Sequence, residues 1–305
     1  DNANPNGSRA GTAFFGGPKS AGSINGLQAE RARIPYANVG LVKIPDNVTD
    51  EQALMLSDIF PTGYFGADIA DIEPGKTVAI FGCGPVGQFA IMSAKMMGAR
   101  RIIAVDMEKS RLSMARDQGA ETIDFQREDP TELILEMTRG IGVDRVIDAV
   151  GVDAFYPTEG PAAQKAQQKL ELYKEELREI MSGGKIKTEE WHHGTAPSIV
   201  SEWAIECVAK AGLISIIGVY PDEVTRYPIG KAMGMNLSIK MGNCPHIRYI
   251  PMLMRKVETG AVDPSEVLTQ VQPVKSVIEA YKTFDDRKAG WMKVELKPSK
   301  QMVGT

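Results

Sequence analysis

Three glycines stand in a G-x-G-x-x-G pattern between an apolar run and an amphipathic run. They are Gly82, Gly84 and Gly87 of "VAIFGCGPVGQFA", and Asp106 ends the next apolar run, "RIIAVD", 19 residues after Gly87. Gly82 permits a tight turn, Gly84 lets the backbone approach a pyrophosphate, and Gly87 lets a helix pack closely on a strand. A carboxylate at this spacing reaches the adenosine ribose hydroxyls. The combination predicts a dinucleotide site.

The acid also indicates which dinucleotide binds. Asp106 would repel the 2′-phosphate of NADP, and no basic residue follows it immediately, so NAD is favoured. The helix after the glycines would present free N–H groups and a positive dipole end to the phosphates. Arg111 lies five residues further and either covers the adenosine side or is a surface residue of a helix. A Rossmann-type domain without nucleotide is the alternative reading.

A second feature is a lone carboxylate, Asp58, in the apolar stretch "ALMLSDIFPTGYFGA" at residues 53–67, just before an expected Pro-Thr-Gly turn. An unpaired buried carboxylate is costly unless it finds a hydrogen-bond donor, a cation or a metal. Most isolated Asp residues cap a helix or point to water. The residues alone therefore leave a solvated or capping role open beside a ligand role.

Length and composition describe an ordinary globular chain of two domains. It has 305 residues, a net charge of -4 and a pI near 5.6, which argue against nucleic acid or an anionic membrane surface as the main partner. We find no membrane-span or signal-peptide pattern. Three scattered cysteines are too few for a disulfide framework or a Cys-only zinc site, so the expected location is cytoplasmic.

The elements that must position these residues alternate between strand and helix. From residue 76 the expected strands are 77–82, 101–106, 122–125 and 143–151, and the helices between them are 86–99, 108–120 and 130–140. Strands that alternate with amphipathic helices predict βαβ units and a parallel sheet. A helix over 197–212 and strands at 213–220 and 237–242 follow, then helices at 247–260 and 274–290 and a strand at 291–296.

Two other segments do not follow this alternation of strands and helices. Residues 28–44 suggest two short strands broken at Pro35-Tyr36, followed by turn and cap residues 46–50 and a helix through the Asp58 run. Residues 152–196 are longer than a normal connection. In this insertion an apolar stripe predicts a surface helix, with a functional lid as the alternative. The stripe is Leu170, Tyr173, Leu177 and Met181.

These residues resemble the zinc-dependent medium-chain alcohol dehydrogenases, and within them the formaldehyde dehydrogenases that do not need glutathione. The matching stretches are "LSDIFPTGYFGADIADIEPGKTVAIFGCGPVGQFA", "AVGVDA", "KAGLISIIGVYPDE" and "KMGNCPHIRYIPMLM". The resemblance implies an α/β fold, a Rossmann doubly wound parallel sheet with remaining pieces of a GroES-like β-rich catalytic domain. The implied segments are 1–60 and 242–305 for the catalytic pieces and 61–241 for the NAD-binding domain.

The resemblance also implies roles for single residues. Asp58 takes the place of the third ligand of a catalytic zinc, and Thr62 that of the threonine beside the nicotinamide. Zinc would polarise the substrate oxygen as a Lewis acid, and hydride would pass to the nicotinamide. The other implied NAD contacts are Gly82, Gly84, Pro85, Val86, Gly87, Asp106, Arg111, Val150, Ile217, Val219, Gly242 and Asn243.

The chain departs from the family pattern at its beginning. It lacks the N-terminal Cys and His zinc ligands, the proton-relay residues and the four-cysteine structural zinc lobe, and it starts at Asp1 without an initiator Met. Either upstream residues are missing or a processed product starts here. We expect this chain alone to hold zinc weakly and to be inactive. Adjacent His192 and His193 chelate poorly, while Cys244 and His246 suggest cofactor-side packing.

The leading hypothesis is a zinc- and NAD-dependent dehydrogenase of a short alcohol or hydrated aldehyde, with formaldehyde the first substrate to test. The alternatives are a non-catalytic NAD-binding module and a zinc-free reductase of the same superfamily, which would not need Asp58. By analogy we expect a homo-oligomer, a dimer or tetramer, since the edge strand near 237–242 permits pairing across a two-fold axis. The insertion resembles one that covers the cofactor and is expected to slow NAD release.

Overall fold

The chain divides into two compact units. The structure is a computed structural model that describes residues 6, 11–17, 19–183 and 194–298. One unit comprises Asp1–Ser57 with Pro245–Thr305, and the other is Asp58–Cys244. The expected domain limits near residues 60 and 242 lie close to these divisions. Assigning the units to GroES-like and NAD-binding domains remains a proposal.

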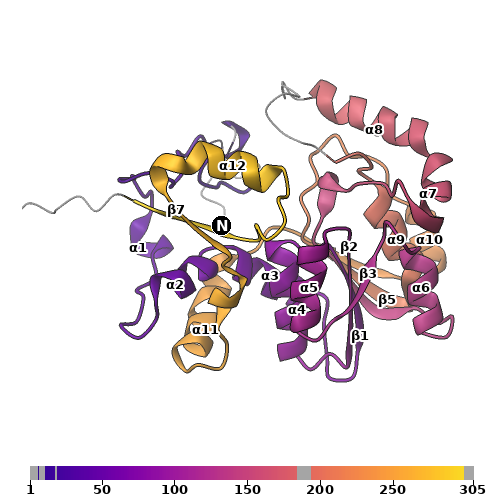
Figure 1. Ribbon diagram of the computed structural model, residues 1–305, viewed down its shortest axis with the longest axis horizontal. Helices are drawn as coiled ribbons and strands as arrows, with labels where there is room; N and C mark the ends of the chain where they lie inside the picture. The colour runs from indigo at the N-terminus through magenta and orange to yellow at the C-terminus, as the bar shows by residue number, and fades with distance from the viewer. Residues whose placement is uncertain (1–5, 7–10, 18, 184–193, 299–305) are drawn as a thin grey trace, which may run out of the picture. The chain divides into compact units, whose positions relative to one another are not determined.

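The unit Asp58–Cys244 (Figure 1) is built on a six-stranded sheet. The strand order is β3-β2-β1-β4-β5-β6. Every neighbouring pair in it is parallel. Its strands are β1 Thr77–Phe81, β2 Arg101–Asp106, β3 Glu121–Asp124, β4 Val143–Asp148, β5 Val208–Ile216 and β6 Ser238–Met241. The predicted α/β doubly wound parallel sheet is confirmed, and β6 lies at its edge.

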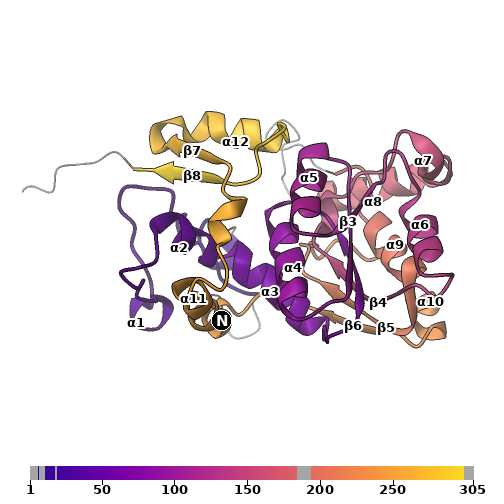
Figure 2. The ribbon, with the colours of Figure 1, turned by 60° about the horizontal axis from the view of Figure 1, so that its bottom comes forward.

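Helices cover both faces of this sheet (Figure 2). Along β1, Val78 and Ile80 point to one core with α3, α4 and α5, whereas Ala79 and Phe81 point to the other core with α6 and α9. The helices are α3 Ile59–Ile69, α4 Pro85–Met96, α5 Lys109–Asp117, α6 Pro130–Met137, α9 Ile199–Cys207 and α10 Ile229–Gly234. This two-sided burial explains why the strands are continuously apolar.

The described part of the insertion contains two α-helices, α7 Gly160–Gln167 and α8 Leu170–Gly183. On α8, Tyr173 is buried and Leu177 half-buried, in line with the predicted stripe. Glu176 is also buried, and its carboxylate accepts a hydrogen bond from the Ser198 hydroxyl at 2.9 Å. The insertion is therefore a packed element of this unit.

The junction between α9 and β5 corrects one prediction. The helix expected over 197–212 ends at Cys207, and β5 begins at Val208. Val208 pairs with Val143 of β4, and Ala211 has a φ of 58° at a shift of register in this pairing. Strand pairing with β4 thus overrides the local helical pattern, because it satisfies backbone groups beside an already buried strand.

In the other unit the predicted strands at residues 28–44 are wrong. This segment contains α1 Ala37–Gly40 and no strand, and most of its side chains are exposed. Within the described residues no neighbouring strand pairs with it, and an unpaired strand leaves its backbone groups unsatisfied. The remaining elements are α2 Asp50–Leu56, α11 His246–Glu258, α12 Val277–Asp285 and a parallel pair, β7 Gln270–Pro273 with β8 Val294–Lys297.

The apolar run around Asp58 forms two helices where one was predicted. The first, α2, begins with a capping box between Thr49 and Gln52, and the second, α3, begins just after Asp58. The expected Pro-Thr-Gly turn is also wrong, because Pro61 lies in the first turn of α3, where its missing N–H costs no helical hydrogen bond. None of the helices in the described parts of the chain has the length and apolar character to cross a membrane.

The packing of α4 on β1 generates a stability prediction. A Cβ on Gly87 would overlap the Gly82 carbonyl oxygen, whereas a Cβ on Gly84 would meet only the Arg111 guanidinium at 3.8 Å. We expect Gly87→Ala to lower the free energy of unfolding by about 3 kcal/mol, since the helix must move off the strand. Gly84→Ala is the matched control and should change it by less than about 0.5 kcal/mol. Urea unfolding of both variants checks this, and equal midpoints would contradict it.

Candidate functional site

The glycine loop connects β1 to α4 with the geometry that its sequence predicts. Gly82 has a φ of 88°, a conformation that favours glycine, and its N–H donates to the Val105 carbonyl at 2.8 Å. Gly84 is the N-cap of α4, Pro85 is its first residue and Val86 follows in the first turn. The N–H groups of this turn have no intrahelical partner, so they are available to an anion.

Asp106, at the carboxyl end of β2, is tied directly to the loop. Its Oδ2 accepts a hydrogen bond from the Cys83 N–H at 2.7 Å, and its Oδ1 accepts from the N–H groups of Met107 at 2.7 Å and Glu108 at 2.9 Å. Arg111 Nη1 lies 4.0 Å from Oδ2. The carboxylate is therefore held beside the glycine loop with a cation next to it.

The residues expected at the nicotinamide follow the ends of β4 and β5. Val150 Cγ2 lies 2.7 Å from the position of a Cβ on Gly82, so this side chain covers the glycine turn. Ile217 Cδ1 approaches a Cβ position on Gly66 of α3 to 2.6 Å, and Val219 is 72% exposed. The carboxyl ends of these parallel strands meet at one edge, and the strand order reverses between β1 and β4. Ligands of open α/β sheets bind at such a switch point.

Asp58 and Thr62 are in contact at the start of α3. The Thr62 hydroxyl donates to Asp58 Oδ1 at 2.8 Å, and Asp58 is exposed. Cys244 lies beside them, and its thiol forms a hydrogen bond with Thr62. Burial raises the pKa of this thiol to about 12, with the hydrogen bond lowering it and the negative charge of Asp58 raising it. Sequence reasoning placed Cys244 at the cofactor side but missed its contact with Thr62, which joins residues far apart in the chain.

The other predicted residues are more dispersed. Gly242 and Asn243 follow β6, and the Gly242 N–H donates to the Ile216 carbonyl at 3.4 Å, so they adjoin the end of β5. His246 begins α11 in the other unit, and His192 and His193 lie outside the described residues. The three cysteines are free thiols, which agrees with the expected absence of a disulfide framework.

The described residues do not form a zinc site. Among them no group of three or more His, Cys, Asp or Glu side chains could hold a metal ion. Of the ligands that the resemblance implies, this part of the chain supplies Asp58 alone. Zinc with one carboxylate ligand lacks the three protein ligands of a catalytic centre.

A buried acid at the end of β4 went unnoticed in the sequence. Asp148 is 1% exposed, and its Oδ2 accepts a hydrogen bond from the Tyr220 hydroxyl at 2.7 Å. Burial raises the pKa of this carboxyl, against the opposing effect of its hydrogen bonds. The sequence contained a signal for it, because in "VDRVIDAVG" the apolar pair Val146-Ile147 is followed by Asp148, much as the apolar run of "RIIAVD" is followed by Asp106.

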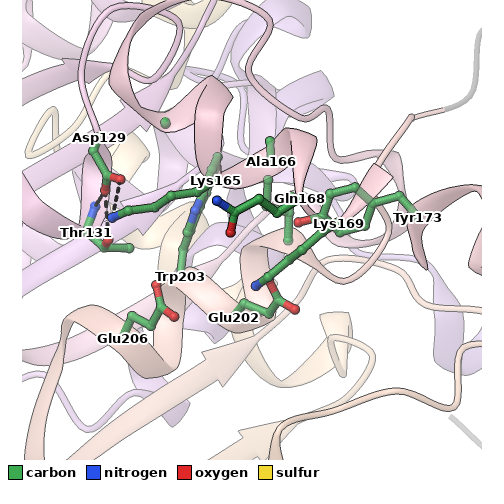
Figure 3. A pocket seen from close by; sticks show the side chains of 12 residues that line it. Asp129, Thr131, Lys165, Ala166, Gln168, Lys169, Tyr173, Glu202, Trp203 and Glu206 are labelled. Atoms are coloured by element: carbon green, nitrogen blue, oxygen red, sulfur yellow. Dashed lines mark hydrogen bonds and ion pairs between the residues drawn. The ribbon is translucent and has the colours of Figure 1, made fainter. Parts of the chain in front are cut away.

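A cavity of about 160 Å³ lies where the insertion meets α6 and α9 (Figure 3). Four of its charged side chains form two ion pairs. Lys165 Nζ lies 2.7 Å from Asp129 Oδ2 at the N-cap of α6, and Lys169 Nζ lies 2.6 Å from Glu202 Oε2 on α9. Trp203 forms part of the wall. These pairs attach the insertion to the face of the sheet opposite α4, away from the glycine loop helix.

The chain is similar to known dehydrogenases along most of its length. A family model for zinc-binding dehydrogenases matches residues 85–159. An uncharacterized zinc-type alcohol dehydrogenase-like protein of Bacillus subtilis is 35% identical over 98% of this chain and 72% of its own length. A glutathione-independent formaldehyde dehydrogenase of Pseudomonas aeruginosa is 31% identical over 92% of this chain and 67% of its own.

A solved structure agrees with these matches. The alcohol dehydrogenase TADH from Thermus sp. ATN1 aligns with a TM-score of 0.74 at 27% identity, over 93% of this chain and 69% of that one. The chain spans 61–72% of the length of the first curated relatives it matches. It belongs to the zinc-type alcohol dehydrogenases, a family of oxidoreductases that act on CH–OH groups.

Proposed function

We propose that the unit Asp58–Cys244 binds NAD and that the protein oxidises a short alcohol or hydrated aldehyde by hydride transfer to it. Formaldehyde is the first substrate to test, since the formaldehyde dehydrogenase is among the relatives at 31% identity. The observation that carries the proposal is the link between the glycine loop and Asp106, whose carboxylate accepts from Cys83 at 2.7 Å within the loop.

The residues present fit an NAD molecule. A side chain on Gly82 would collide with Val150, and one on Gly87 with the loop itself, whereas a Cβ on Gly84 would meet only the Arg111 guanidinium, at 3.8 Å. We assign the pyrophosphate to the backbone of Gly84, Pro85 and Val86 and the adenosine ribose to Asp106 and Arg111. For the nicotinamide side we propose Thr62, Val150, Ile217, Val219, Gly242 and Asn243. When bound, NAD supplies the hydride acceptor.

Zinc does not fit the described residues, so we derive no step through it. Its place in the proposal depends on the family and on Asp58, which Thr62 contacts at 2.8 Å. The second candidate stays a non-catalytic NAD-binding module, which would use the glycine loop and Asp106 without metal ligands. A zinc-free reductase of the same superfamily stays the third alternative, and a measured zinc content separates it from the first. A cytoplasmic homo-oligomer, dimer or tetramer, also stays a prediction.

The cofactor proposal predicts a change of selectivity on Asp106→Asn. The substitution removes the charge that accepts from the ribose hydroxyls and repels a 2′-phosphate, so the preference for NADH over NADPH should fall about tenfold. Titration of both cofactors by protein fluorescence measures the two dissociation constants.

The matched control is Asp124→Asn, which changes the acid at the end of the neighbouring strand β3, where it accepts from the Gln126 N–H at 3.1 Å. This variant should leave the NADH to NADPH ratio unchanged. Equal effects of both substitutions, or no effect of Asp106→Asn, would refute the assignment of the adenosine ribose to Asp106.

The metal proposal predicts that Asp58→Ala abolishes zinc binding while the fold persists. The test uses a form of the protein that also carries the Cys and His ligands implied by the resemblance, in which elemental analysis should find roughly one zinc per chain before the substitution and a clear deficit after it. Oxidation of formaldehyde or a short alcohol should fall by a factor of about 100 or more. Asp68→Ala on the same helix is the control and should retain both. Unchanged zinc content and activity in Asp58→Ala would exclude the ligand role.

A further inference from the structure

The buried carboxylate of Asp148 organises the two loops that follow β4 and β5. Its Oδ1 accepts from the N–H groups of Val150 at 2.9 Å and Gly151 at 3.0 Å, and its Oδ2 accepts from the Tyr220 hydroxyl at 2.7 Å. No ion pair in the described parts of the chain includes it. These neutral donors are what make the buried charge tolerable.

The backbone around Asp148 adds further connections between the two loops. The N–H groups of Ile217 and Gly218 both donate to the Asp148 carbonyl, at 3.0 and 2.9 Å, and the Val152 N–H donates to the Val219 carbonyl at 2.9 Å. A Cβ on Gly218 would overlap the backbone of Gly151. The two loops are thus in direct backbone contact, and the Tyr220 hydroxyl is the side-chain link that joins them across Asp148.

This link controls the residues assigned to the nicotinamide. The Val150 N–H donates to the Asp148 carboxylate, which holds this residue in position. Val150 Cγ2 lies 2.7 Å from where a Cβ on Gly82 would be. Val219 directly precedes Tyr220 and is 72% exposed, so its side chain is free to meet a ligand. The adenosine side depends on Asp106 and the first turn of α4, which make none of these contacts.

We propose that Tyr220 is a positioning residue that fixes the nicotinamide half of the NAD site through Asp148 and leaves the adenosine half unaffected. The inference rests on the proposed function. Loss of the hydroxyl leaves one carboxylate oxygen of Asp148 without its partner, and the released loops then hold Val150 and Val219 less firmly. A nicotinamide-bearing ligand should lose affinity, and the same ligand without nicotinamide should not.

The test compares NADH with ADP-ribose, which lacks only the nicotinamide ring. In Tyr220→Phe the dissociation constant of NADH should rise about five- to tenfold, the effect of one hydrogen bond to a charged group. That of ADP-ribose should stay within about twofold. Calorimetric titration of the whole protein gives both constants, and thermal unfolding confirms that the variant is folded.

Tyr227→Phe is the matched control. Burial raises the pKa of the Tyr227 hydroxyl, and the charge of nearby Asp148 raises it further, yet among the described residues this hydroxyl makes no hydrogen bond. Its removal should change neither constant. Equal losses for NADH and ADP-ribose in Tyr220→Phe, no loss for either, or the same loss in Tyr227→Phe would each overturn the inference. If the unsubstituted protein binds neither ligand, the proposed function fails and the inference fails with it.

Discussion

The close approach of α4 to β1 is the constraint on which the nucleotide site depends. A helix can bring its first N–H groups to a phosphate at the sheet edge only if its first turn lies almost against the strand that precedes it. Here that contact is between Gly87 and the Gly82 carbonyl, with no room for a side chain. This contact fixes the position of the glycine loop. The loop in turn contacts Asp106 through the Cys83 N–H and Val150 through Gly82.

Asp106 and Asp148, the acids at the ends of β2 and β4, are both buried carboxylates that need partners, and their partners differ. Both carboxylates accept hydrogen bonds from backbone N–H groups, but Asp106 also has the Arg111 guanidinium at 4.0 Å and is 7% exposed, whereas Asp148 is 1% exposed and its other partner is the Tyr220 phenol. An acid with a cation beside it keeps a charged partner when a ligand hydroxyl approaches. For Asp148, losing the phenol would leave a fully buried carboxylate oxygen without a partner. The first is suited to contact a ligand and the second to hold the loops around it.

The sequence predicted those features that are encoded within a few residues of one another. The structure has the predicted alternation of strands and helices, with the glycine loop between β1 and α4 and Asp106 at the end of β2. Such features can be predicted because periodicity and turn chemistry are local. Features that depend on distant partners were missed. The end of α9 was overridden by pairing with β4, residues 28–44 found no strand to pair with, and the contacts of Tyr220 with Asp148 and of Cys244 with Thr62 join separate segments.

The same distinction separates cofactor binding from chemistry in this chain. Every residue assigned to NAD belongs to one compact unit, and most of them lie on a single βαβ unit or at the next strand ends. A catalytic zinc needs three donors that converge from separate segments. The Thr62 hydroxyl donates to Asp58, and the Cys244 thiol lies near both, but Asp58 and Cys244 are too few donors for a tetrahedral site. Nucleotide recognition can therefore be argued from the described residues themselves, whereas the metal chemistry depends on donors that these residues do not supply.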